Sequence, residues 1–182
     1  PEATPKQMGW FNELQRRSAS PENAVKLMRV LSGIDVRDLL PQVKIPTLVF
    51  HSRGDLAIPF QQGEMLAAGI PNARFVPLES RNHILIESEP AWQEFSEISR
   101  QFLNDNAHVL PMIRGPAAPA VPPATVTPND KYGECEGPDG ARIAFASAGE
   151  GFPIVKAPNW MTKLDLDWGS PVYGHWLREA VR

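Results

Sequence analysis

Residues 46–55 read Pro-Thr-Leu-Val-Phe-His-Ser-Arg-Gly-Asp, an apolar, β-branched run that ends in a polar turn. A run of this length between Pro and Gly is typical of a buried strand in a parallel sheet. The pattern then predicts a helix over residues 61–68, a second strand at Ala73–Leu78, and a further helix that begins near Pro90. Strand, helix, strand and helix in this order indicate a βαβα unit, so the expected fold class is α/β with a parallel sheet.

The same reading extends to both ends of the chain. Helices are predicted over Gln7–Arg17 and Pro21–Leu31, the second with a Ser-Pro start signal. After a long gap, Tyr132–Glu136 and Arg142–Ser147 flank a Pro-Asp-Gly turn, which predicts a β-hairpin. A third strand is expected at Pro153–Ala157, so the second part of the chain begins with β-structure.

Composition excludes several classes of protein. Of the 182 residues, 42% are hydrophobic and 21% charged, which rules out disorder of the whole chain. The net charge of −3 offers no electrostatic attraction for nucleic acid, and no apolar run is long enough to span a membrane. Cys135 is the single cysteine and the four histidines are scattered, so neither an intrachain disulfide nor a metal site is expected. No phosphate-binding glycine loop is present, and we predict no cofactor.

Proline divides the chain. Six of its 19 prolines lie between Pro111 and Pro128, among Ala, Val and Thr, a composition that favours a semi-rigid polyproline linker. We therefore divide the sequence into a first part at residues 1–104, a linker at 105–130 and a second part at 131–182.

Two residues stand where chemistry is expected. Asp55 follows the first strand of the βαβα unit and His83 follows the second, so both belong at the carboxyl edge of the sheet, where ligands bind. A carboxylate that orients an imidazole forms two thirds of a hydrolytic triad. The alternative is structural: Asp55 caps a turn and His83 caps a helix. His51, inside a strand, is interpreted as a core histidine rather than a ligand.

Several segments resemble the α/β-hydrolase family. Residues 46–55 are similar to its acid-bearing strand and loop, and residues 69–87 to its last strand and histidine loop. Residues 139–145 and 153–157 resemble its opening hairpin and the strand before the oxyanion loop. The similarity is greater to one bacterial subgroup of the family, in which hydrolase domains are fused to signalling or transcription-regulator modules. The segments that resemble this subgroup are Phe11–Arg16, Asn82–Leu85, Val155–Trp160 and Asp167–Val172.

The resemblance implies roles for individual residues. Asp55 matches the triad acid and His83 the general base, while Asn159 and Trp160 match the loop whose backbone N–H stabilises the oxyanion. Pro158 has no N–H, so a donor is expected further on, at Trp160.

The chain departs from the family in two respects. No Gly-x-Ser-x-Gly occurs, so the nucleophile is absent. In this chain, the segment that resembles the end of the family's fold also precedes the segment that resembles its beginning, and the middle of the fold is missing. A permuted chain is one interpretation. We favour the junction of two domains, in which the end of one hydrolase domain precedes the start of another. Because strands would then lack neighbours, we expect the chain alone to be marginally folded.

The expected function follows from the resemblance. The parent is a serine hydrolase of an ester or a related small carbonyl substrate, and this chain is a fragment without turnover of its own. The alternative is a non-catalytic domain that senses a small-molecule ligand and acts on a fused regulatory module outside this chain; a third is a fragment without function. We expect a cytoplasmic location, with no membrane or direct nucleic acid partner.

Overall fold

The computed structural model of the chain describes residues 2–106, 132–148, 153–157 and 163–181. Its contacts divide it into two units, which are described separately below: Pro1–Met8 with Pro21–Met112, and Gly9–Ser20 with Ile113–Arg182. Across the described ranges, no helix combines the length and the apolar character that crossing a bilayer requires.

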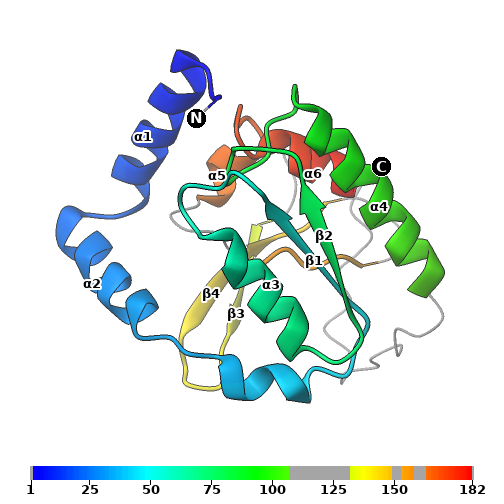
Figure 1. The fold of residues 1–182 in the computed structure, drawn as a ribbon. Coiled ribbons are helices and arrows are strands. Elements are labelled where there is room, and N and C mark those ends of the chain that lie inside the picture. Colours follow the sequence, from blue (N-terminus) through cyan, green and yellow to red (C-terminus); the bar gives the residue numbers. More distant parts are fainter. Residues whose placement is uncertain (1, 107–131, 149–152, 158–162, 182) are drawn as a thin grey trace. The chain divides into compact units, whose positions relative to one another are not determined.

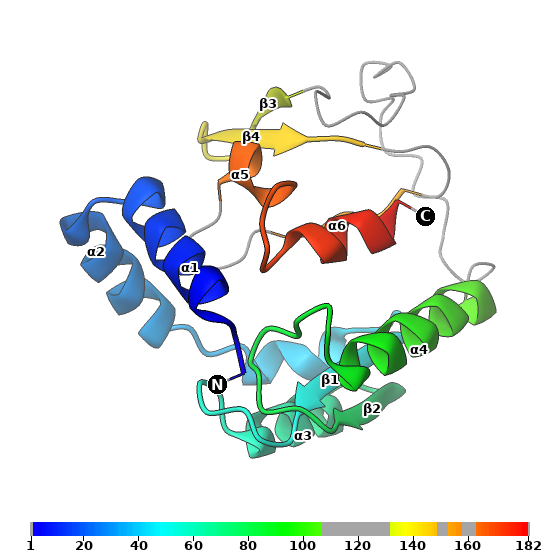
Figure 2. The ribbon, with the colours of Figure 1, turned by 90° about the horizontal axis from the view of Figure 1, so that it is seen from above.

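A parallel βαβα arrangement forms the centre of the first unit (Figure 1). Strand β1 (Thr47–Ser52) pairs in parallel with β2 (Ala73–Leu78), with Thr47 opposite Ala73 and Ser52 opposite Leu78. Helix α3 (Phe60–Gly69) connects the two strands and α4 (Pro90–Asn106) follows β2. Figure 2 shows α3 on one side of the strand pair and α4 on the other. The predicted mixed α/β unit is confirmed, and α4 continues two residues into the predicted linker.

The core of this unit lies around the two strands. Its buried apolar side chains come from the two strands, from the loop that carries His83, from the end of α3 and the start of α4, and from a 3₁₀ helix that precedes β1. They are Leu40, Val49, Ile70, Val76, Leu78, Leu85, Ile86, Ala91 and Trp92. Phe50 packs against Phe95 of α4 with the ring centroids 4.7 Å apart. Pro77 sits within β2, and since proline donates no hydrogen bond, it suits β2 to the edge of a sheet.

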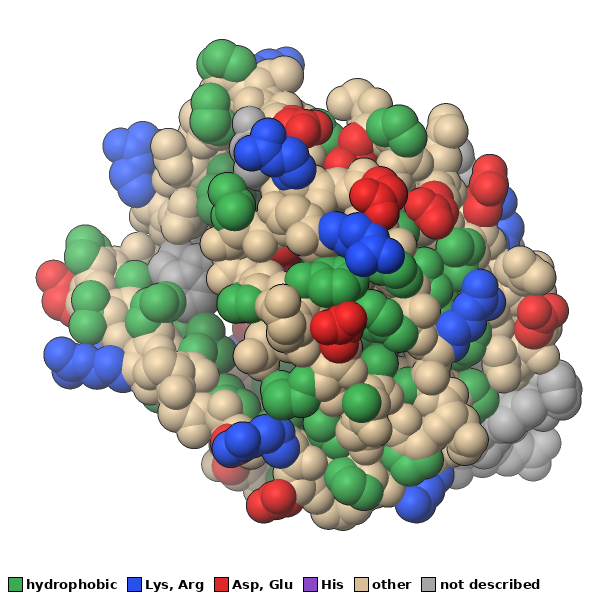
Figure 3. Space-filling view, in the orientation of Figure 1, with side chains coloured by type: hydrophobic (Ala, Val, Ile, Leu, Met, Phe, Trp, Pro, Cys, Tyr) green, Lys and Arg blue, Asp and Glu red, His purple; other side chains and the backbone are tan. Residues whose placement is uncertain are grey.

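Helices precede the sheet, as the sequence predicts. Helix α1 (Pro5–Ser18) contributes residues to both units, and α2 (Pro21–Ser32) and the 3₁₀ helix η1 (Arg37–Gln42) belong to the first. No residue of α2 is buried, although Val25, Met28 and Leu31 are apolar. Figure 3 shows apolar side chains on the surface of this helix. The helix therefore presents an apolar surface that the described residues leave uncovered.

The second unit contains the predicted hairpin. Strands β3 (Tyr132–Glu136) and β4 (Arg142–Ala146) pair antiparallel, and the turn is closed by the N–H of Gly137, which donates to the Ala141 carbonyl over 2.8 Å. Two short helices follow, α5 (Leu164–Asp167) and α6 (Gly174–Ala180). The buried apolar residues of this unit are Leu14, Val172 and Tyr173.

One predicted element is wrong. Residues 153–157 do not form the expected third strand, and Val155 is 92% exposed. A strand is stable only when a neighbour satisfies its backbone, and within the described residues nothing pairs with this segment. Residues 107–130 of the predicted linker lie outside the described residues.

Candidate active site

The loops that follow β1 and β2 are tied to each other by their backbones. The N–H of Arg53 donates to the Leu78 carbonyl over 3.0 Å, and the N–H of Gly54 donates to the Ser80 carbonyl over 2.9 Å. A side chain at position 54 would not fit, because a Cβ there would lie 2.9 Å from Cγ of Arg81 and 3.2 Å from the Ser80 carbonyl oxygen. The parallel pairing thus continues beyond the strands and brings the two polar loops together.

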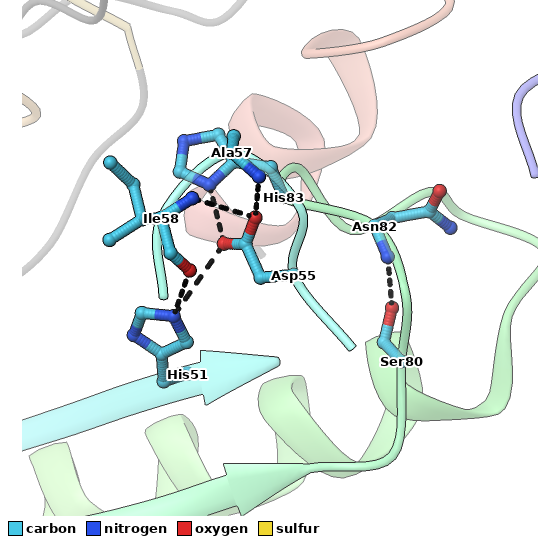
Figure 4. Close-up of polar contacts among 7 residues, drawn as sticks. All are labelled: His51, Asp55, Ala57, Ile58, Ser80, Asn82 and His83. Atoms are coloured by element: carbon cyan, nitrogen blue, oxygen red, sulfur yellow. Dashed lines mark hydrogen bonds and ion pairs between the residues drawn. The ribbon is translucent and has the colours of Figure 1, made fainter. Parts of the chain in front are cut away.

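Asp55 is held by hydrogen bonds on both carboxylate oxygens (Figure 4). Oδ1 accepts the backbone N–H of Ala57 at 2.7 Å and that of Ile58 at 3.1 Å. Oδ2 lies 2.7 Å from Nδ1 of His83. The side chain is only 4% exposed, so its orientation is set by these partners rather than by water.

These contacts also set the ionisation of Asp55. Burial raises the pKa of the carboxyl, whereas the hydrogen bonds from His83, Ala57 and Ile58 lower it, as does the charge of a protonated His83. The hydrogen bonds prevail, and the pKa of Asp55 lies below its ordinary value. Asp55 is therefore a carboxylate at neutral pH and can only accept hydrogen bonds.

His83 is oriented by that carboxylate. Because Asp55 only accepts, Nδ1 of His83 carries the proton of their hydrogen bond, and Nε2 of a neutral ring keeps its lone pair. The side chain is 52% exposed. The structure therefore brings Asp55 and His83 together as a carboxylate–imidazole pair with a free basic nitrogen, an arrangement that can accept a proton from a nucleophile.

A buried carboxylate that the sequence analysis did not single out anchors the loop of His83. Glu89 accepts from the Ser80 hydroxyl at 2.5 Å, from the Ile86 N–H at 2.6 Å and from the Asn82 side-chain amide at 3.3 Å. The N–H of Asn82 donates in turn to the Ser80 hydroxyl oxygen at 3.0 Å (Figure 4). The only sequence signal for this role is the position of Glu89 directly before Pro90, where α4 begins.

His51 also approaches Asp55. Its side chain is nearly buried, which agrees with its interpretation as a core histidine. Its Nε2 lies 3.1 Å from the Ile58 carbonyl oxygen and 3.6 Å from Oδ2 of Asp55. No local sequence pattern connects this histidine with the pair.

Within the described residues, no further member of a triad joins this pair. Asn159 and Trp160, the predicted oxyanion residues, lie outside the described residues. In the part of the chain that the structure describes, no serine is hydrogen bonded to His83, and no cluster of His, Cys, Asp and Glu side chains could hold a metal ion. Asp167 of α5 is a further buried acid, whose pKa is raised by burial.

Known proteins similar to the chain are hydrolases. It is 34% identical over 83 residues to a RutD protein of Pseudomonas savastanoi pv. phaseolicola, and 28% identical over 111 residues to one of Rhizobium rhizogenes. RutD proteins are provisionally named carbamate hydrolases. It is also 29% identical over 101 residues to the AB hydrolase superfamily protein YisY of Bacillus subtilis.

These matches cover 46%, 55% and 56% of this chain, and 31%, 42% and 37% of the respective relatives. The chain thus spans between about a third and two fifths of the length of these curated relatives. No family model and no solved structure matches it. At modest identity and over part of their length, these relatives support the resemblance of the chain to the α/β-hydrolase family.

Proposed function

We propose that Asp55 and His83 are the acid and the general base of a serine-type hydrolase. The observation that supports this role is the 2.7 Å contact between Oδ2 of Asp55 and Nδ1 of His83, with Asp55 buried and His83 half exposed. A carboxyl that merely capped a turn would need only the two backbone donors on Oδ1. The second oxygen is committed to an imidazole whose other nitrogen remains basic.

In this mechanism a serine hydroxyl attacks the substrate carbonyl carbon. Nε2 of His83 takes the hydroxyl proton, and Asp55 stabilises the resulting imidazolium through Nδ1–H. Backbone N–H groups of the loop after the third strand of the same domain stabilise the oxyanion. Trp160 would take that position in the domain that residues 131–182 open, not in the domain of Asp55 and His83. His83 then returns the proton to the leaving group, and water repeats the sequence to release the acid and regenerate the serine.

The substrate class we propose is an ester or a related small carbonyl compound. A carbamate, the substrate class in the name of the RutD relatives, falls within it. The chain itself lacks the Gly-x-Ser-x-Gly segment, so we propose that the serine is supplied from outside this sequence. Residues 1–104 would then close one hydrolase domain and residues 131–182 open another, with a linker between them at 105–130.

A fluorophosphonate probe, which labels activated serines covalently, tests this proposal on the 182-residue chain. We expect no site-specific labelling, and hydrolysis of a p-nitrophenyl ester that is the same in wild type and His83→Ala. Labelling of any one serine, or ester turnover that His83→Ala abolishes, would show that the nucleophile lies within this chain and contradict the proposal.

A longer form that includes a Gly-x-Ser-x-Gly segment provides the positive test. Its serine should be labelled, and Asp55→Asn or His83→Ala should each lower kcat/KM by about 10²–10⁴-fold. If the nucleophile's Ser→Ala variant loses turnover but keeps an unchanged response to ligand in a fused module, ligand sensing is the function instead.

A further inference from the structure

His51 lies at the carboxyl end of β1, on the side of the strand that faces α3. Its ring stands edge-on to Phe60, with centroids 5.7 Å apart and planes at 87°. It also rests on Gly63, where an added Cβ would lie 2.6 Å from Nδ1 of His51. A glycine at this helical position therefore provides the space that the imidazole occupies, and two residues of α3 contact the ring.

The position of the ring determines its tautomer. Nε2 lies 3.1 Å from the Ile58 carbonyl oxygen, which can only accept a hydrogen bond. Oδ2 of Asp55 lies 3.6 Å from Nε2; it belongs to a carboxylate and also only accepts. Nε2 of His51 must therefore carry a proton. This is the opposite tautomer from that of His83, whose proton is on Nδ1.

The bond to Ile58 acts on the turn that binds Asp55. In that turn the N–H of Ile58 donates to Oδ1 of Asp55, while the carbonyl of the same residue accepts from His51. Ile58 is thus fixed at both of its backbone polar groups, and Figure 4 shows Asp55 lying between the two imidazoles. If His51 released the carbonyl, one of the two backbone donors on Oδ1 would be free to move.

We propose that His51 is a positioning residue for the Asp55–His83 pair. Through Nε2–H it holds the turn at residues 55–58 and so keeps Oδ2 of Asp55 directed at Nδ1 of His83. The inference rests on the proposed function, in which that pair is the acid and base, but it concerns the geometry of the pair and not turnover. It assigns a role to a histidine that is neither the base nor a ligand.

The tautomers can be measured on the 182-residue chain without any substrate. In a sample labelled with ¹⁵N-histidine, ring nitrogen shifts distinguish Nδ1–H from Nε2–H at a pH near 8, where an ordinary imidazole is neutral. We expect Nε2–H for His51 and Nδ1–H for His83, with the signals assigned by their loss in His51→Gln and His83→Gln. A His51 that shows Nδ1–H, or the mixture of a free imidazole, overturns the proposal.

Two substitutions then test the positioning role. Glutamine places an amide N–H near the position of Nε2, so His51→Gln should retain the Nδ1–H form of His83. Leucine fills similar space without a donor, so His51→Leu should shift His83 towards the tautomer mixture of a free imidazole. His175→Gln, a buried histidine of the other unit, is the matched control and should leave His83 unchanged.

The outcomes separate this inference from the proposed function. If His83 is Nδ1–H in the wild type and remains so in His51→Leu, the pair stands and the positioning role is overturned. If the Nδ1–H form of His83 is lost in His51→Gln as fully as in His51→Leu, an N–H donor at position 51 does not hold the pair, and the positioning role is also overturned. If wild-type His83 lacks the Nδ1–H form, the acid–base pair itself fails.

Discussion

Asp55 and Asp35 show how differently two lowered carboxyl pKa values arise in one chain. Asp35 is exposed, and its hydrogen bonds from the Arg37 side chain and backbone lower its pKa to about 2. Asp55 is buried, which by itself raises its pKa, and the three hydrogen bonds it accepts reverse that effect. Only Asp55 accepts a hydrogen bond from a distant part of the chain, at His83, so its ionisation is coupled to the tertiary structure, whereas that of Asp35 depends on Arg37, two residues along the chain.

This coupling predicts how stability depends on pH. The pKa of Asp55 in the folded chain lies below 3.8, so the unfolded chain binds its proton first as the pH falls. The stabilising contribution of Asp55 is therefore complete at pH values well above 3.8. It is lost as the pH falls towards the lowered pKa of the folded chain. In urea titrations between about pH 6 and pH 3, the free energy of unfolding should fall less steeply for Asp55→Asn than for wild type.

Asp35→Asn is the matched control, because its carboxyl pKa is lowered in the same direction. Salt screens exposed pairs far more than buried ones. We compare how steeply the free energy of unfolding falls with pH. At about 1 M salt, Asp35→Asn and wild type should no longer differ in this slope, whereas Asp55→Asn and wild type should still differ. Identical salt dependence for both variants would contradict the burial of the Asp55 carboxylate.

At the scale of elements, one carboxylate, that of Glu89, accepts the hydrogen bonds that hold the loop between β2 and α4. Glu89→Ala would leave the Ser80 hydroxyl and the Ile86 N–H buried without their acceptor. We expect it to lower the free energy of unfolding by about 1–3 kcal/mol, measured by urea denaturation. Glu94→Ala removes an exposed carboxylate from the following helix, α4, and should change stability by less than about 0.5 kcal/mol. Equal effects would show that Glu89 does not anchor the loop.

Local sequence patterns predict the elements best where the pattern and the packing agree. β2 has its predicted bounds, Ala73–Leu78, because this largely apolar run, in which only Arg74 is exposed, pairs along its length with β1. Residues 153–157 have an equally apolar pattern but form no strand. The difference lies in pairing, which a local pattern does not contain. A run of apolar residues predicts that a segment can be a strand, not that a partner is present.

The same distinction applies to the site. The proximity of Asp55 and His83 follows from the sequence, because the carboxyl ends of two parallel strands must meet at one edge. The parts played by His51 and Glu89 do not follow from it. His51 reads as one residue of an apolar strand, and Glu89 as an ordinary residue before a helix. Their contacts depend on side-chain directions across 7 to 9 residues of irregular loop, which only the structure provides.

At the scale of the molecule, the two sheets are small and much apolar surface is uncovered. Within the described residues each sheet has two strands, and β1 has a neighbour on one edge only. β2 carries Pro77, which weakens its outer edge as a template for pairing, but β1 contains no proline. The uncovered side of β1 and the apolar surface of α2 are therefore two places where another chain could bind.

This arrangement predicts that the chain associates with itself. Thermal melts followed by near-UV circular dichroism should shift with protein concentration, since any partner that covers these surfaces stabilises the folded form. Met28→Lys with Leu31→Lys makes α2 polar without touching the sheet, as both side chains are exposed. If α2 drives association, this variant melts independently of concentration; if the edge of β1 does, the dependence remains. A cooperative wild-type melt that is independent of concentration would contradict both, and would mean that a two-stranded parallel sheet suffices to hold the Asp55–His83 pair.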